Sequence, residues 1–248
     1  MAERVLQDRD VWLAIAIRGK DGGVCLFGAE LPEAALERAN LAQSDLRLAN
    51  LTGASLRKAF LHRADARWAK LESADLESAN LAKANLSFAE LNRARLSEAY
   101  AVLSNLTGAS LEEAVLEVAD LSGACLNHAK LMLAKAARMR APQADLRFAD
   151  LTEADLSQAE LTHTKWFDAK LSGANLAWAN LGGADLRGVD LTDVDVEHAI
   201  LEGTLIAKRW EPSLAGYEGV PRWVEDDGEL EEDEGPELRE AWEVLGRG

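Results

Sequence analysis

The chain has 248 residues, of which 48% are hydrophobic but only 6% aromatic, and its formal net charge is −16. This length allows one or two domains with a sizeable core, which must be built from Leu and Ala because aromatic residues are so few. So acidic a chain repels nucleic acid and anionic lipid and favours basic partners. The two cysteines, Cys25 and Cys125, form neither a CxxC pair nor a metal-binding spacing, which is typical of a reducing compartment.

Residues 1–25 are expected to form an N-terminal cap. The segment lacks the basic region and the long apolar run of a signal peptide, and its apolar stretch 11–17 is too short to span a bilayer. We therefore predict a cytoplasmic protein. The segment is apolar enough to form a short helix or a strand over the first repeats; its larger apolar residues are Trp12, Leu13, Ile15 and Ile17.

Residues 26–206 repeat with a period of five. Leu occupies 30 of the 37 positions counted in fives from 26 to 206, and Ala occupies 29 of the 36 positions that lie two residues before them. A helix turns by about 100° per residue, so this period would scatter Leu around it. A continuous strand would place alternate Leu on opposite faces. The pattern predicts a short extended piece and then a bend, with Ala and Leu pointing inward, the residue between them outward, and the next two residues at the corner.

The tandem motif A(D/N)LXX, seen in ADLESANLAKANLSFAEL at 74–91, resembles the pentapeptide-repeat proteins. This resemblance implies an all-β fold, a right-handed quadrilateral β-helix with four pentapeptides in each coil. At about 4.8 Å per coil, the repeats would make some nine coils and a rod of roughly 43 Å. Trp166 takes a Leu position, where we expect it to fill the interior.

Two segments depart from the motif. Residues 99–105 place Ala101 at a Leu position, and residues 135–143 include Met139 and Pro142. The period of five continues across both segments. We therefore predict a bulge or a short loop at each and no long insertion.

Residues 207–248 form an acidic, Trp-containing C-terminal extension. The run at 225–235 is interpreted as a solvated linker, and residues 236–246 as a short helix that begins at Pro236 and ends at Gly246. The extension is predicted to cap the solenoid or to form a homodimer through this end. The residues proposed for this role are Trp210, Trp223, Leu238, Trp242 and Leu245.

The sequence shows no arrangement typical of an enzyme. The four histidines, at 62, 128, 163 and 198, would lie several coils apart or on different sides of the rod, and no phosphate-binding loop or Gly-x-Ser-x-Gly motif occurs. Asp recurs at regular surface positions, where a structural or solvated role is the simpler interpretation. We expect a non-enzymatic protein without cofactor or metal.

Some members of the resembled family protect type II topoisomerases from quinolones, as acidic dimeric rods that imitate DNA. In this chain residues 1–25 and 26–140 each have no net charge, whereas residues 141–206 and 207–248 each carry −8. A dimer joined at the C-terminal end would place this charge at its centre. The resemblance thus implies DNA gyrase or topoisomerase IV as the partner, with no direct nucleic-acid binding. The candidate partner-binding residues are Asp145, Asp150, Asp155, Asp185, Asp190 and Asp195.

An alternative is a protein-interaction scaffold that uses an exposed ladder or the C-terminal tail. Residues twenty apart would stack at one corner, where Leu48, Trp68 and Phe88 form an apolar ladder beside Arg47 and Arg67. Aromatic residues and Arg are typical of interface cores. Such stacked side chains also serve simply to shield the corner, and the sequence leaves the two interpretations open.

Overall fold

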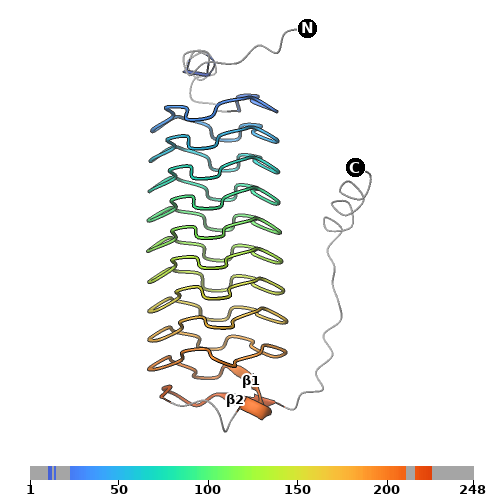
Figure 1. The fold of residues 1–248 in the computed structure, drawn as a ribbon, viewed down its shortest axis with the longest axis vertical. Helices are drawn as coiled ribbons and strands as arrows, with labels where there is room; N and C mark the ends of the chain where they lie inside the picture. Colours follow the sequence, from blue (N-terminus) through green and yellow to red (C-terminus); the bar gives the residue numbers. More distant parts are fainter. Residues whose placement is uncertain (1–10, 13, 15–22, 211–215, 225–248) are drawn as a thin grey trace, which may run out of the picture.

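The computed structural model describes residues 11, 12, 14, 23–210 and 216–224. From Cys25 the chain winds into a single stack of coils, with the N-terminal residues at one end and strands β1 and β2 at the other (Figure 1). Parallel bridges join every fifth residue to the one twenty positions later, from Cys25 with Asp45 to Asp185 with Leu205. One coil therefore contains four pentapeptides, and the bridges fall into four columns, which we call walls. The right-handed sense of the coil stays a prediction.

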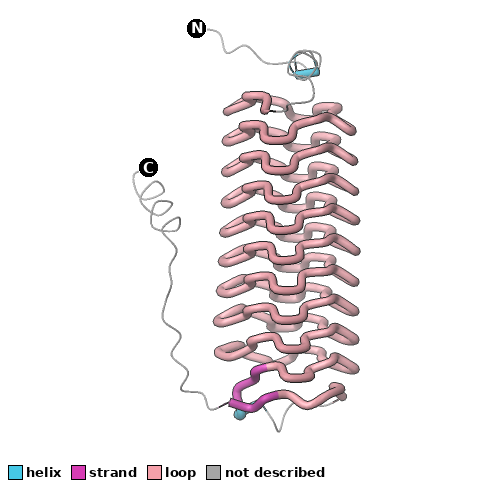
Figure 2. The backbone as a smooth tube through the Cα atoms, turned by 180° about the vertical axis from the view of Figure 1, so that it is seen from behind, coloured by secondary structure: helices cyan, strands magenta, loops and turns pink. Residues whose placement is uncertain are grey.

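Residues 74–79 show how one pentapeptide holds to the next coil. The amide of Leu76 donates to the carbonyl of Arg95 at 2.7 Å, and the amide of Arg95 donates to the carbonyl of Ala74 at 2.9 Å. At the corner, Ser78 has φ +56°, and its amide donates to the carbonyl of Ser97 at 2.9 Å. The corner closes with a 2.9 Å hydrogen bond from the amide of Ala79 to the carbonyl of Leu76. Only one residue per pentapeptide forms a bridge, so each wall is a ladder of isolated bridges. The coils are therefore drawn as loop in Figure 2, with strand colour only at β1 and β2.

The second corner position lies in the left-handed region throughout the repeats. Non-Gly residues occupy it with φ near +60°, among them Trp68, Phe88 and Val118. Glycine is the residue that best tolerates this region, and for the others it costs roughly 1–2 kcal/mol. Inter-coil hydrogen bonds of 3.2 Å, 2.9 Å and 3.2 Å from these three amides offset part of that cost.

The two inward positions fill the interior. Their Ala and Leu side chains form one continuous cluster of buried residues from Val24 to Ile206. Trp166 is 0% exposed, which confirms that it belongs to the core. Its indole Nε1 donates to Thr164 Oγ1 at 2.6 Å, and that hydroxyl donates to the carbonyl of Leu161 at 2.6 Å. The indole Nε1 of the buried Trp166 therefore has a hydrogen-bond acceptor.

The prediction of a bulge or a short loop at 99–105 and at 135–143 is wrong. Both segments keep the regular repeat, with bridges from Tyr100 to Asp120 and from Arg140 to Glu160. Pro142 fits because it stands at the first corner position, whose amide donates to no carbonyl of a neighbouring coil, and its own carbonyl accepts from the amide of Gly123 at 2.8 Å. Ala101 and Met139 are simply buried, at 2% and 1% exposure.

Both ends of the solenoid are covered by chain outside the repeats. At the N-terminal end, residues 11, 12 and 14 are helical, Val11 is buried, and Trp12 Nε1 donates to the carbonyl of Ala35 at 3.1 Å. At the other end β1 (Leu205–Ala207) is followed by a 3-10 turn, η2 (Lys208–Trp210), and pairs in parallel with β2 (Arg222–Val224). The helix predicted at 236–246, with Leu238, Trp242 and Leu245, lies outside the described residues.

The ladder is loosened at one place, between the coil that contains residues 168–173 and the next. The amides of Asp168, Leu171 and Gly173 lack the inter-coil backbone hydrogen bond that their counterparts in the described coils from 28 to 163 make. A hollow of about 350 Å³ lies there, lined in part by Thr152, Asp168, Lys170 and Thr192. Directly inside, Val189 and Val194 replace the Ala that fills both of these inward columns in every earlier coil. We infer that the larger valine side chains prevent these hydrogen bonds from forming.

Replacing both valines, Val189→Ala and Val194→Ala, is expected to close the hollow and to slow amide exchange at Asp168, Leu171 and Gly173 about fivefold. One inter-coil hydrogen bond, worth about 1 kcal/mol, would form at each amide. Hydrogen exchange read by NMR measures this. The amide of Trp166, which already donates to the carbonyl of Asp185 at 2.9 Å, serves as the internal control. Equal slowing at Trp166, or none at the three amides, would contradict the explanation.

Candidate functional site

The four walls carry the polar chemistry of the described solenoid. We name them by their bridge columns: wall A from Cys25 to Leu205, wall B from Glu30 to Asp190, wall C from Ala35 to Asp195 and wall D from Asn40 to Ile200. Each wall includes the two corner residues that follow every bridge residue. In the described part of the chain no group of three or more His, Cys, Asp or Glu is placed to hold a metal ion, and no helix there has the length and apolarity to cross a membrane.

The six predicted partner-binding aspartates have a structural task in common. Each carboxylate accepts a hydrogen bond of 2.9–3.2 Å from the backbone amide two residues later, which fixes the corner. They do not form one surface, because Asp145 and Asp185 lie on wall A, Asp150 and Asp190 on wall B, and Asp155 and Asp195 on wall C. On wall A, Arg147 and Arg187 pair with their aspartates at 2.7 Å and neutralise them.

The excess negative charge is instead collected on wall B. This wall holds ten acidic and four basic side chains, a net charge of −6, whereas walls A and D are each balanced and wall C carries −2. We call wall B the acidic wall. Its charged residues are Glu30, Glu33, Lys70, Glu72, Glu90, Arg93, Glu112, Glu113, Lys130, Asp150, Glu153, Lys170, Asp190 and Asp193.

Most carboxylates of the acidic wall are available to a partner. Arg93 pairs with Glu113 at 3.1 Å and with Glu72 at 3.8 Å, and Lys170 with Asp150 at 3.4 Å. Within the described residues the other seven carboxylates of this wall form no ion pair; they belong to Glu30, Glu33, Glu90, Glu112, Glu153, Asp190 and Asp193.

Two aspartates of this wall are held in the ionised form. At Asp190 the hydrogen bonds from the side chain and the amide of Thr192 lower the pKa. Burial raises the pKa of Asp150, but hydrogen bonds from Thr152 and Lys170 outweigh it, and the pKa is lowered overall.

The ladder predicted at the corner of wall A exists. The rings of Trp68 and Phe88 stack with centroids 5.9 Å apart and planes 11° from parallel, and Leu48 above them is 51% exposed. The next position of this column is Gly108. The Phe88 ring lies over it, and a Cβ at this position would come within 2.6 Å of the ring. The lower part of the same corner carries a second stack, between His128 and Phe148, with centroids 4.7 Å apart.

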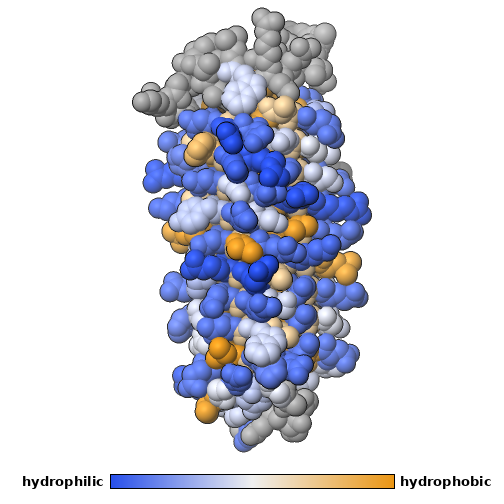
Figure 3. Space-filling model, turned by 90° about the vertical axis from the view of Figure 1, so that its left-hand side faces the viewer, coloured by the Kyte–Doolittle hydropathy of each residue, from blue (hydrophilic) through white to orange (hydrophobic). Residues whose placement is uncertain are grey.

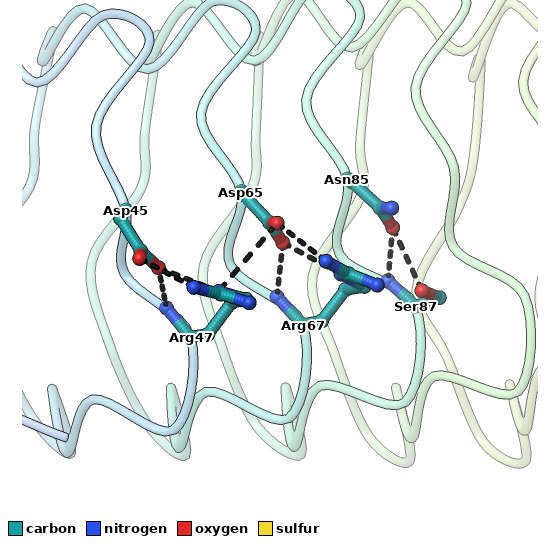
Figure 4. Close-up of polar contacts among 6 residues, drawn as sticks. All are labelled: Asp45, Arg47, Asp65, Arg67, Asn85 and Ser87. Atoms are coloured by element: carbon teal, nitrogen blue, oxygen red, sulfur yellow. Dashed lines mark hydrogen bonds and ion pairs between the residues drawn. The ribbon is translucent and has the colours of Figure 1, made fainter. Parts of the chain in front are cut away.

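The two arginines beside this ladder are bound to their own wall (Figure 4). Arg47 donates to both carboxylate oxygens of Asp45 at 2.8 and 2.7 Å, and Arg67 does the same to Asp65 at 2.9 and 2.8 Å. The hydrogen bond from Arg47 lowers the pKa of Asp45. Arg67 also lies over the Trp68 ring at 5.5 Å. A partner of the ladder would therefore meet neutral ion pairs and aromatic rings rather than free cations.

A sequence model of pentapeptide repeats, in eight copies, matches residues 29–65, 61–98, 103–135, 138–165 and 169–205. The chain belongs to the pentapeptide-repeat family. No curated protein matches this pentapeptide-repeat chain.

Solved structures of other pentapeptide-repeat proteins resemble it. HetL, involved in heterocyst differentiation regulation in the cyanobacterium Nostoc sp. strain PCC 7120, is 27% identical over 91% of this chain and 99% of its own, with a TM-score of 0.43. QnrB1, a plasmid-mediated fluoroquinolone resistance protein, is 16% identical over 92% of this chain and 98% of its own, also with a TM-score of 0.43. A pentapeptide-repeat protein of the Arabidopsis thaliana thylakoid lumen is 26% identical over 46% of this chain and 69% of its own, with a TM-score of 0.24. Superpositions this loose carry no functional argument.

At the C-terminal end of this pentapeptide-repeat solenoid, two of the tryptophans proposed for capping pack against the core. Trp210 and Trp223 are both partly buried there, and Trp210 Nε1 donates to the carbonyl of Val189 at 3.1 Å. Their contacts with the last coil account for them without a second subunit. Dimerisation through this end stays a prediction.

Proposed function

We propose that this pentapeptide-repeat protein is a non-enzymatic binding protein whose acidic wall docks on the cationic DNA-binding surface of a type II topoisomerase, DNA gyrase or topoisomerase IV, and protects it from inhibitors. The observation that supports this is the concentration of six of the eight excess negative charges of residues 26–206 on one wall. A row of carboxylates along a rod resembles a nucleic-acid backbone in shape and in sign of charge. It is therefore complementary to a basic groove on a partner.

The charge density indicates the strength of such a complex. Duplex DNA carries one negative charge per about 1.7 Å. The rod, with net −8 over roughly 43 Å at about 4.8 Å per coil, carries one per about 5 Å. With about a third of the charge density of DNA, binding is expected to be weaker than that of DNA, fast and sensitive to salt.

Reversing three charges on the acidic wall, with Glu90→Lys, Glu112→Lys and Glu153→Lys, is expected to abolish protection. These changes bring the wall from −6 to neutral while all three side chains stay at outward positions. The matched control reverses three outward glutamates on walls C and D, with Glu37→Lys, Glu117→Lys and Glu160→Lys, and alters the total charge equally. Gyrase supercoiling in the presence of a quinolone measures protection. The proposal is wrong if the parent protein gives no protection at micromolar concentration, or if both variants lose protection equally.

A second candidate is a scaffold that binds a protein through the ladder of Leu48, Trp68 and Phe88. The partly exposed, stacked rings of Trp68 and Phe88 and the exposed Leu48 favour it, because a row of apolar side chains on a polar rod is typical of a contact site. Figure 3 shows one side of the molecule, on which hydrophobic residues are scattered singly among hydrophilic ones. If partner capture survives Trp68→Glu, the ladder is not the contact site.

We also propose that the full chain forms a homodimer through its C-terminal end. Trp242→Glu together with Leu245→Glu is expected to halve the mass measured by light scattering. A parent protein of monomer mass would contradict this.

A further inference from the structure

Wall D carries an exposed patch that is basic and apolar in an otherwise acidic protein. Phe60 and Tyr100 share its bridge column two coils apart, about 10 Å along the rod, and each is 48% exposed. Leu103 at the corner is 55% exposed. Around them lie Lys58, Arg63 and Lys83, all exposed. We call these six residues the basic–aromatic patch.

The cations of this patch are unpaired, unlike most arginines of the rod. Lys58, Arg63 and Lys83 form no ion pair within the described residues, whereas Arg57, for example, binds Glu77 through two contacts of 2.6 Å. Wall D has no Asp or Glu among its bridge and corner residues before Asp120.

Two carboxylates near the patch are engaged by arginines, whereas Glu98, two residues before Tyr100, accepts a hydrogen bond from Ser78 at 3.1 Å and forms no ion pair within the described residues. Asp65 is held by Arg67 at 2.8 Å, and Glu77 also accepts from Arg95 at 3.2 Å. The patch therefore has a local positive field and exposed rings without a partner among the described residues.

We propose that the basic–aromatic patch binds the acidic C-terminal segment of the same chain, residues 225–248. Residues 225–248 contain eleven acidic side chains and two basic ones, and the part that reaches the patch brings Glu234, Glu237 and Glu240 with apolar Leu238 and Trp242. The sign of charge and the pairing of carboxylates with Lys and Arg beside aromatic rings are complementary on the two sides. Nucleic acid, the other polyanion, is repelled by the net charge of −16.

The segment starts close enough to reach the patch. β2 ends at Val224 and pairs with β1, which begins at the last bridge residue of wall A, and wall A shares a corner with wall D. Because β2 pairs with β1 one coil further along, Val224 lies about six coils from Tyr100 and eight from Phe60, about 30 and 40 Å. An extended chain covers 3.3–3.6 Å per residue, so about nine to twelve residues span this distance, and residues from about 233 onward reach the patch. Attachment to the same chain gives an effective concentration in the millimolar range, which favours this segment over that of a second copy.

This inference is independent of the proposed topoisomerase binding, but it is an alternative to the dimer proposed above, because both use the same C-terminal residues. Walls B and D lie on opposite sides of every coil, so the bound segment would leave the acidic wall free. Loss of topoisomerase protection and loss of segment binding are therefore separate results.

Zero-length carbodiimide cross-linking of the full chain, followed by peptide mapping, tests the proposal. Lys58 and Lys83 are expected to link to Glu234, Glu237, Glu240 or Glu243 at least tenfold more often than Lys130 and Lys135, which are equally exposed but lie outside the patch. The links should fall severalfold at 0.5 M salt, where charges are screened beyond about 4 Å. They should also fall severalfold in a Phe60→Ala, Tyr100→Ala variant, which keeps both lysines.

Three outcomes would overturn the proposal. The first is an even distribution of links over all four lysines. The second, in a mixture of isotopically light and heavy chains, is a majority of links between two molecules. The third is that a single-stranded oligonucleotide binds the full chain and suppresses the links at equimolar concentration, which would identify the patch as a nucleic-acid site.

Discussion

Replacing Leu111 by Asp is expected to unfold the middle of the solenoid, whereas Ser110→Asp, one residue earlier, is expected to leave it intact. Leu111 is 1% exposed and stacks in the inward column between Leu91 and Leu131. Burial of even an un-ionised polar group without a hydrogen-bond partner costs several kcal/mol, and a carboxylate costs more. Ser110 stands at the outward bridge position, where Asp150 and Asp190 already lie in the same column.

The pair of variants separates the effect of position from the effect of the residue. Far-ultraviolet circular dichroism and thermal melting should show a large loss for Leu111→Asp and a change in the free energy of unfolding within about 0.5 kcal/mol for Ser110→Asp. Because each coil contacts only its neighbours, a local defect can divide the rod into two parts, so limited proteolysis should cut Leu111→Asp near the substituted coil. Similar melting of both variants would refute the inward–outward alternation on which the whole fold depends.

The path of the backbone follows from the period of five, but the corner conformation does not. Leu and Ala two residues apart define which side chains are buried, and bridges at twenty-residue intervals follow once four pentapeptides close a coil. By contrast, Trp and Val do not favour a positive φ, so the residue types at 68 and 118 do not predict the left-handed conformation found there. They adopt it because the next coil accepts their amides, which is a tertiary effect.

The candidate binding residues are harder to predict, because the surface depends on how charge is distributed around the coil rather than along the chain. Asp145 and Asp155 are ten residues apart in the sequence but lie on opposite walls. The acidic wall is recognised only when residues twenty positions apart are grouped together. The sequence predicts the acidic wall once four pentapeptides per coil are assumed, because residues twenty apart then share a wall. The pairing of Arg147 with Asp145 at 2.7 Å depends on side-chain geometry that the sequence does not specify.

Trp166→Ala is expected to destabilise the protein by about 3–5 kcal/mol, the range for removing a large aromatic side chain from a core. The indole is 0% exposed, and its loss would leave both a cavity and Thr164 Oγ1 without the donor at 2.6 Å. Trp178→Ala is the matched control. That indole is 58% exposed and stacks only on His198, with centroids 4.1 Å apart, so less than about 1 kcal/mol should be lost.

Urea unfolding followed by circular dichroism gives both values, and Trp166→Leu adds a third. Leu is the usual residue of this column, as at Leu146 and Leu186, and it refills most of the volume without a polar atom. Its loss of stability should therefore fall well below that of Trp166→Ala. If Trp166→Ala and Trp178→Ala unfolded at the same urea concentration, the indole of Trp166 would not be packed in the interior.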